Sequence, residues 1–222
     1  RADRLAHHGV DFEDIAEPPV ASLLRDHSAP VRLVREESAR DLAFLARHDS
    51  DPFNRWEAIQ CIAEHAILAA HGGRSDAAAE WRGALLGALG DLLDDPAQDP
   101  AFVAECLLPP DEVWLGERIE AVDPVHLHAV REDLRAAIGG GLAAALERQL
   151  ELLGGDDGSA VDARARTRRR LKNVALALRM AHDPQVSAPR AFAQLHAARN
   201  MTDRLAALTE LVHHGIAGAD DA

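Results

Sequence analysis

The chain has 222 residues and a formal net charge of −13, because 37 Asp and Glu outnumber 24 Lys and Arg. This acidic balance argues against a surface that neutralises nucleic-acid phosphates or anionic lipids. With 47% hydrophobic residues the chain can bury a core, but it has no apolar run of about 18–20 residues that would span a membrane.

The first 35 residues differ from the rest of the chain. Residues 10–15 and 31–34 could each form a short strand, and the Pro18-Pro19 pair and Pro30 interrupt any helix between them. Two short strands bury too little surface to be stable alone. We therefore expect residues 1–35 to be the tail of a preceding β domain or an extended arm. The chain starts at Arg1 without Met or a signal peptide, as a piece of a longer protein would.

From Ser38 onward, helix starts recur along the chain. Ser38 to Asp41 resembles a capping box, and three Asp-Pro pairs place an N-cap acid before a proline at the first helical position. The composition agrees, because the chain is rich in Ala and Leu and has no Tyr, 5 Phe and 3 Trp. The first predicted helix begins at Ser38, and the others cover residues 52–71, 75–93, 101–107, 111–120, 124–153, 160–182, 188–198 and 202–214.

These signals predict a mainly α fold. Helices joined by tight acidic turns suggest antiparallel pairs in an irregular α-solenoid or bundle over residues 36–222, with a short β remnant at the N-terminus. After Asp51, apolar residues recur every three or four positions, which places Phe53 and Trp56 on the buried face as core aromatics. Three consecutive glycines, 139–141, should kink or split the helix over 124–153.

The twelve histidines raise the question of a metal site. The closest set is His126, His128 and Glu132, in which His128 and Glu132 share a helix face. The pairs His65 with His71 and His213 with His214 are weaker. A zinc site needs three or four converging ligands, and none of these sets supplies them from local sequence, so we expect solvated or capping histidines.

Two other groups have structural interpretations. Cys61 and Cys106 are too few for a disulfide scaffold and are expected to be small buried hydrophobic residues in a reducing compartment. Residues 164–172 (RARTRRRLK) form the one basic cluster, but it lacks aromatic residues and spreads around the helix. Ion pairing within the chain or an interdomain contact is therefore favoured over nucleic-acid binding.

The sequence contains no recognisable catalytic arrangement. It has no Gly-x-Ser-x-Gly elbow, no glycine loop between a strand and a helix, and no His-Glu-x-x-His. We therefore assign no catalytic, cofactor-binding or metal-binding residue in this chain, and we expect the fragment alone not to be an enzyme.

Several segments, in the same order along the chain, nevertheless resemble bacterial aminopeptidase N, a family of zinc metallopeptidases. The three longest are residues 48–58 (HDSDPFNRWEA), 19–31 (PVASLLRDHSAPV) and 200–208 (NMTDRLAAL). The family usually carries Phe where this chain has His27. Shorter matches fall between them at 99–105 (DPAFVAE), 108–110 (LPP), 122–124 (VDP) and 171–173 (LKN). Together the matches cover about residues 12–210.

The resemblance implies what this piece is. In the family, an N-terminal β domain, a thermolysin-like catalytic domain and a β-sandwich precede a helical domain that caps the active-site chamber. Residues 1–35 would then be the end of the sandwich, and residues 36–222 the first part of the helical domain. The zinc ligands, the general-base Glu, the motif that reads the free amine and the transition-state Tyr would lie elsewhere in the parent.

The resemblance also implies the function and the partners. The parent would be a cytoplasmic zinc aminopeptidase that removes N-terminal amino acids from peptides, and this fragment would hold no cofactor. Its partners would be the parent's catalytic and β-sandwich domains and the parent's peptide substrates, with no nucleic acid and no membrane. The alternative, from the helical pattern alone, is a free-standing α-solenoid that binds other proteins.

Overall fold

The computed structural model describes residues 19–25, 38–154 and 162–218. These residues form ten α-helices and no strand, as the mainly α prediction requires. The predicted strands at 10–15 and 31–34 lie outside the described residues. The helices are α1 (Ala39–His48), α2 (Pro52–His71), α3 (Ser75–Asp94), α4 (Pro100–Cys106), α5 (Glu112–Gly116), α6 (Pro124–Gly141), α7 (Ala143–Gly154), α8 (Ala163–His182), α9 (Pro184–Ala197) and α10 (Met201–His213).

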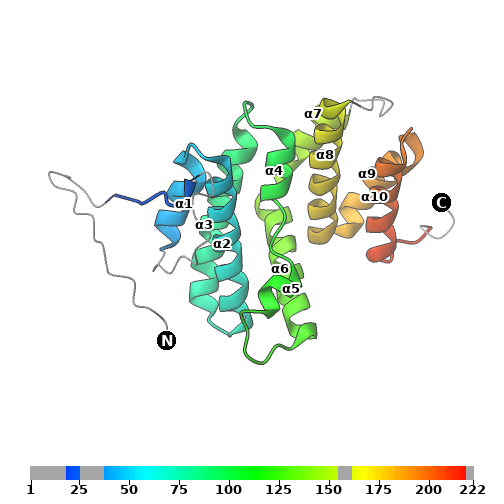
Figure 1. Cartoon of the computed structure of the whole chain (residues 1–222). Coiled ribbons are helices and arrows are strands. Elements are labelled where there is room, and N and C mark those ends of the chain that lie inside the picture. Colours follow the sequence, from blue (N-terminus) through cyan, green and yellow to red (C-terminus); the bar gives the residue numbers. More distant parts are fainter. Residues whose placement is uncertain (1–18, 26–37, 155–161, 219–222) are drawn as a thin grey trace, which may run out of the picture.

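The helices stack in chain order, from α1 to α3 at one end to α9 and α10 at the other (Figure 1). Neighbours in sequence pack as antiparallel pairs, α2 with α3 and α9 with α10, while α8 also contacts α4 and α6. This is the irregular solenoid that the sequence predicts. None of the described helices combines the length and the hydropathy that crossing a bilayer requires.

The N-caps form as the sequence predicts. The Ser38 side chain accepts a hydrogen bond from the Asp41 backbone N–H, and the carboxylates of Asp51, Asp99 and Asp123 cap the helices whose first residue is the following proline. Three boundaries are wrong by three residues or more. Helix α8 begins at Ala163 rather than residue 160, because Asp162 caps it. Helix α9 begins at Pro184 rather than residue 188, because Asp183 caps it, and α5 ends at Gly116, four residues early.

The buried face of α2 also corrects the sequence analysis. Ile59 and Ile62 are buried as predicted, but Phe53 is 40% exposed and Trp56 is only half-buried. The prediction of a core aromatic is therefore wrong for Phe53, whereas Trp56 is partly buried and packs against the core. Their rings contact each other at a tilt, with centroids 5.6 Å apart, and the buried position in this first turn belongs to the polar Asn54.

The three glycines do split the predicted helix over 124–153, and α7 starts after a break at Leu142. The first of these glycines is required by the neighbouring helix α8. A β-carbon at Gly139 would overlap the backbone carbonyl oxygen of Leu178, so the two helices could not approach so closely with any larger residue. The contact is locked by Arg179, whose Nη1 donates to the Gly139 carbonyl oxygen at 2.9 Å.

Candidate functional site

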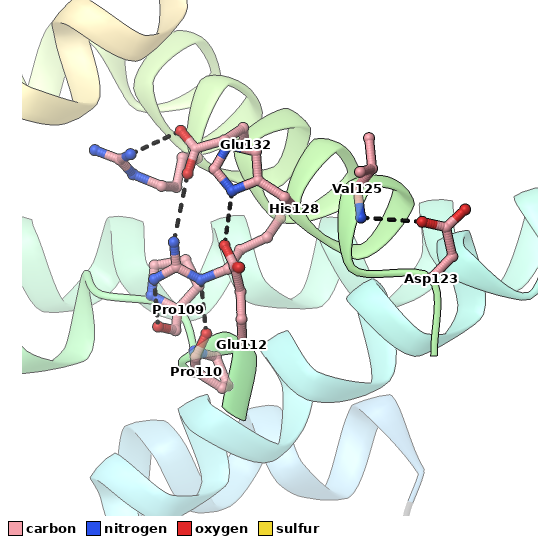
Figure 2. Close-up of polar contacts among 9 residues, drawn as sticks. Pro109, Pro110, Glu112, Asp123, Val125, His128 and Glu132 are labelled. Carbon is pink, nitrogen blue, oxygen red and sulfur yellow. Dashed lines mark hydrogen bonds and ion pairs between the residues drawn. The ribbon is translucent and has the colours of Figure 1, made fainter. Parts of the chain in front are cut away.

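The histidines closest to a metal-ligand set do not converge. The Nδ1 atom of His128 lies 2.8 Å from a carboxylate oxygen of Glu112, on α5 (Figure 2). The ring of His126 packs against His71 instead. Glu132 is bound by two arginines of its own helix, Arg131 at 3.4 Å and Arg135 at 2.7 Å. Each member of the set thus has a different structural partner.

Of the weaker histidine pairs, His213 and His214 contact each other edge to face, with ring centroids 4.9 Å apart, but His65 has partners other than His71. His65 stacks on Trp81 and its Nδ1 lies 2.7 Å from the Cys61 carbonyl oxygen. Within the described part of the chain, no group of three or more His, Cys, Asp and Glu side chains could hold a metal ion. These residues do not fit a zinc site.

One acid and one histidine near the C-terminal end are buried together. Glu210 on α10 and His214, the C-cap of that helix, lie one turn apart, with 3.6 Å between Oε2 and Nε2 and only 15% of each side chain exposed. Burial raises the pKa of Glu210 and lowers the pKa of His214, so both shifts favour the uncharged forms.

Two residues of the basic segment 164–172 form ion pairs within the chain. Arg170 pairs with Glu105 on α4, and the Lys172 ammonium lies 2.6 Å from a carboxylate oxygen of Asp203. This confirms the prediction of intramolecular pairing for these two residues.

The motif at 48–58 joins α1 and α2 to the segment that precedes them. The Asn54 amide is buried and donates to the Ser22 hydroxyl and to the Leu23 carbonyl oxygen, both at 3.1 Å. The next residue, Arg55, donates to the Ala46 carbonyl oxygen at 3.0 Å and to Gln98 at 3.1 Å. The motif therefore ties three separate segments of the chain together.

Asp49 completes this junction. Its side chain is fully covered and lies 3.8 Å from the guanidinium of Arg25. Burial by itself would raise the pKa of Asp49, but hydrogen bonds, the strongest from Ser22, together with the charge of Arg25, hold that pKa below its usual value. The carboxylate is thus kept charged as an internal anchor for residues 19–25.

The motifs at 171–173 and 200–208 meet in a second polar cluster. Besides Lys172, Asp203 accepts hydrogen bonds from the side-chain amides of Asn173 at 3.1 Å and Asn200 at 3.0 Å. Asn200 in turn caps α10 by accepting from the Asp203 backbone N–H at 2.9 Å. Gln194 closes the network by donating to Asn173 and to the Asp203 carbonyl oxygen.

A family model described as a domain of unknown function (DUF3458_C) with ARM repeats matches residues 39–222, most of the chain. The chain belongs to this family.

Two curated relatives that match the chain are both aminopeptidase N. The chain is 40% identical to aminopeptidase N of Caulobacter vibrioides over 210 residues, which is 93% of this chain and 24% of the relative. It is 30% identical to aminopeptidase N of Escherichia coli over 210 residues, covering 90% of this chain and 23% of the relative. The chain is thus homologous to the C-terminal helical domain of aminopeptidase N and spans about a quarter of these relatives.

A solved structure shows the same fold. The crystal structure of Legionella pneumophila aminopeptidase A in complex with aspartic acid matches 95% of this chain and 25% of that chain, with a TM-score of 0.75 at 24% identity. At this identity the likeness concerns the fold alone.

Two hollows of this DUF3458_C domain were not predicted from the sequence. One, of about 550 Å³, lies between α2, the segment after α4, and α5, with Phe53, Trp56 and Trp114 in its wall. The other, of about 740 Å³, lies between α4, α6 and α8 and is lined by Arg135, Arg166, Arg169 and Arg170. Leu108 lines both, so the two hollows adjoin. We call the first the aromatic hollow and the second the arginine hollow.

Proposed function

We propose that this chain is a non-catalytic part of an aminopeptidase N-like zinc metallopeptidase, which removes N-terminal amino acids from peptides. The observation that carries the proposal is the 40% identity to aminopeptidase N over 93% of the chain. The order of the matched motifs from 19–31 to 200–208 supports it, because both clusters described above are built from those motifs.

In this proposal, residues 1–35 are the end of a preceding β-sandwich and residues 36–222 begin the helical domain that helps to cap the active-site chamber. The contacts of Asn54 and Asp49 with Ser22, Leu23 and Arg25 support a fixed junction there. The direct partners are the catalytic and β-sandwich domains of the parent chain.

We propose that the zinc ion of the parent enzyme is bound by the parent's catalytic domain. The described residues of this chain do not fit a zinc site, so we propose that they hold no cofactor and contribute shape and surface instead. We place the parent in the cytoplasm, and the free thiols of Cys61 and Cys106 support a reducing compartment.

The test compares the 222-residue chain with the full-length product of the same gene. We expect the full-length protein to hydrolyse an alanyl anilide, to lose that activity with a chelator and to regain it with zinc. The isolated chain should release no more product than a heat-killed control, with or without zinc.

Two results would contradict the proposal. Chelator-sensitive turnover by the isolated chain would mean that it has its own metal site. A full-length product with no His-Glu-x-x-His and no activity would favour the alternative, a free-standing α-solenoid that binds other proteins.

A further inference from the structure

The outward side of α10 is apolar. Three of its large side chains are more than half exposed and a fourth is only partly buried; in chain order the four are Met201, Leu205, Leu208 and Val212. Their spacing of four, three and four residues places them on one stripe along the helix. The inner side of α10 buries Ala207 and Leu211 against the core. Helix α10 therefore has apolar residues on two sides, whereas a helix at a solvated surface needs them on one.

Helices α9 and α10 form one end of the helical stack (Figure 1). The two helices pack on each other and on α8, so their outward sides turn away from the other helices. The outward side of α9 carries small apolar side chains at exposed positions three or four residues apart, namely Val186, Pro189, Ala193 and Ala197. Small side chains let a neighbouring helix approach closely. We call these four residues, together with the stripe of α10, the end face.

A solvated helix of the same chain has a different surface. The exposed residues of α3 include the charged side chains Asp76, Glu80, Arg82 and Asp91. In a stack of helical units, the terminal unit keeps a polar outer face unless another unit packs on it. The end face therefore has the pattern of an internal face that a further helix covers.

The charges around the end face are positive. Arg199 and Arg204 are exposed, and no described residue forms an ion pair with either side chain. Arg204 borders the stripe, because it lies four residues before Leu208 on the same helix. The acids between residues 184 and 214 are Asp203 and Glu210, and both are largely buried. A chain with a net charge of −13 thus has a basic border at this face.

We infer that the end face is the docking surface of an amphipathic helix with carboxylates beside its apolar stripe, and that the parent chain supplies this helix. The inference rests on the proposed function for the source of the helix. The chain spans 24% of the Caulobacter relative, so a parent of that length has residues to supply it. The apolar stripe packs on the end face, and the carboxylates pair with Arg199 and Arg204. A second copy of this chain fits less well, because a two-fold contact would bring two basic borders together.

The first test labels the end face in the full-length protein. Leu205→Cys places a thiol on the stripe, and Arg82→Cys places one at an exposed position of α3 as the matched control. A maleimide is added under native conditions, and mass spectrometry of tryptic fragments gives the rate of labelling at each position. We expect position 205 to react at least about tenfold more slowly in the full-length protein than in the 222-residue chain, because the thiol reacts only when the covering helix lifts off. Position 82 should react equally fast in both.

The second test concerns the chemistry of the covering helix. The probe is a fluorescein-labelled peptide with three repeats of Glu-Leu-Leu-Glu-Ala-Leu-Ala, in which carboxylates border a stripe of leucines. We expect saturable binding to the 222-residue chain by fluorescence anisotropy, weakened about tenfold by Leu205→Asp and by Arg204→Glu but not by Arg82→Glu. All three side chains are exposed, so these variants should keep the melting temperature of the chain. The peptide with Lys in place of each Glu should bind at least about tenfold more weakly, although the net charge of the chain would attract it.

Four results would overturn the inference. Position 205 could react equally fast in the full-length protein and in the chain. The acidic peptide could fail to bind, or the Lys peptide could bind equally well. Sedimentation could show that the chain forms dimers that Leu205→Asp dissociates, which would make a second copy the occupant.

The activity test of the proposed function is separate from these tests. A full-length protein that cleaves the alanyl anilide but leaves position 205 reactive refutes only this inference. A full-length protein that protects position 205 but has no activity refutes only the proposed function.

Discussion

The strongest test of the packing concerns the ion pair between Lys172 and Asp203, which join α8 to α10. Only 11% of the lysine side chain and 3% of the aspartate side chain are exposed. Replacing Asp203 with Ala leaves the lysine ammonium buried without its counter-charge and removes the acceptor of two further hydrogen bonds, from Asn173 and Asn200. We expect the free energy of unfolding to fall by about 3–5 kcal/mol.

Urea denaturation followed by circular dichroism measures this loss. With a slope of about 2 kcal/mol per molar urea, the midpoint should drop by roughly 2 M. The matched control is Asp94→Asn, which breaks the exposed pair with Arg148, where more than half of each side chain is accessible. That change should cost no more than about 1 kcal/mol.

A double variant, Lys172→Met with Asp203→Leu, separates charge from packing. Because it removes both buried charges, it should be less destabilised than the sum of the two single variants, by about 1–3 kcal/mol. The reasoning is refuted if Asp203→Ala shifts the midpoint no more than Asp94→Asn does, or if the two single effects are simply additive.

Three further predictions follow from burial. Gly139→Ala should cost about 3 kcal/mol by forcing α6 away from α8, whereas Gly116→Ala, with open space around it, should be neutral; thermal melts compare the two. Burial raises the pKa of Cys106 to about 12, so a thiol reagent should label only Cys61 until denaturant is added. Burial raises the pKa of Glu210, so ionisation of its carboxyl group lowers the free energy of unfolding as the pH rises above about 4.5. The Glu210→Gln variant should therefore be more stable than the unsubstituted chain at pH 8 but not at pH 4.

The helices were predictable because their signals are local. An acid before a proline caps a helix through its own next residues, so Asp51, Asp99 and Asp123 needed no tertiary information. The periodicity failed at Phe53 because the first turn of α2 meets a polar segment. Its inward position binds the backbone at Leu23 and therefore takes Asn54, which leaves the ring outside.

The polar clusters and the two hollows were not predictable in this way. Asp203 follows a helix cap and has the sequence context of an exposed first-turn acid, and its burial depends on Lys172, which lies 31 residues earlier. Arg135 and Arg166 likewise share a hollow only because α6 and α8 pack together. In the sequence, only the family resemblance of residues 171–173 and 200–208 pointed to these regions. A resemblance of this kind gives no distances between side chains.

The glycine contact between α6 and α8 has a consequence for recognition. Where two helices meet through side chains, they can slide or roll as rotamers change, but here the backbone of Gly139 rests on the backbone at Leu178 and is held by Arg179. The separation of the α6 and α8 backbones at this point is therefore set by main-chain contact. The arginine hollow takes wall residues from both helices, so this contact holds its backbone frame and only its side chains remain to be ordered by an incoming molecule.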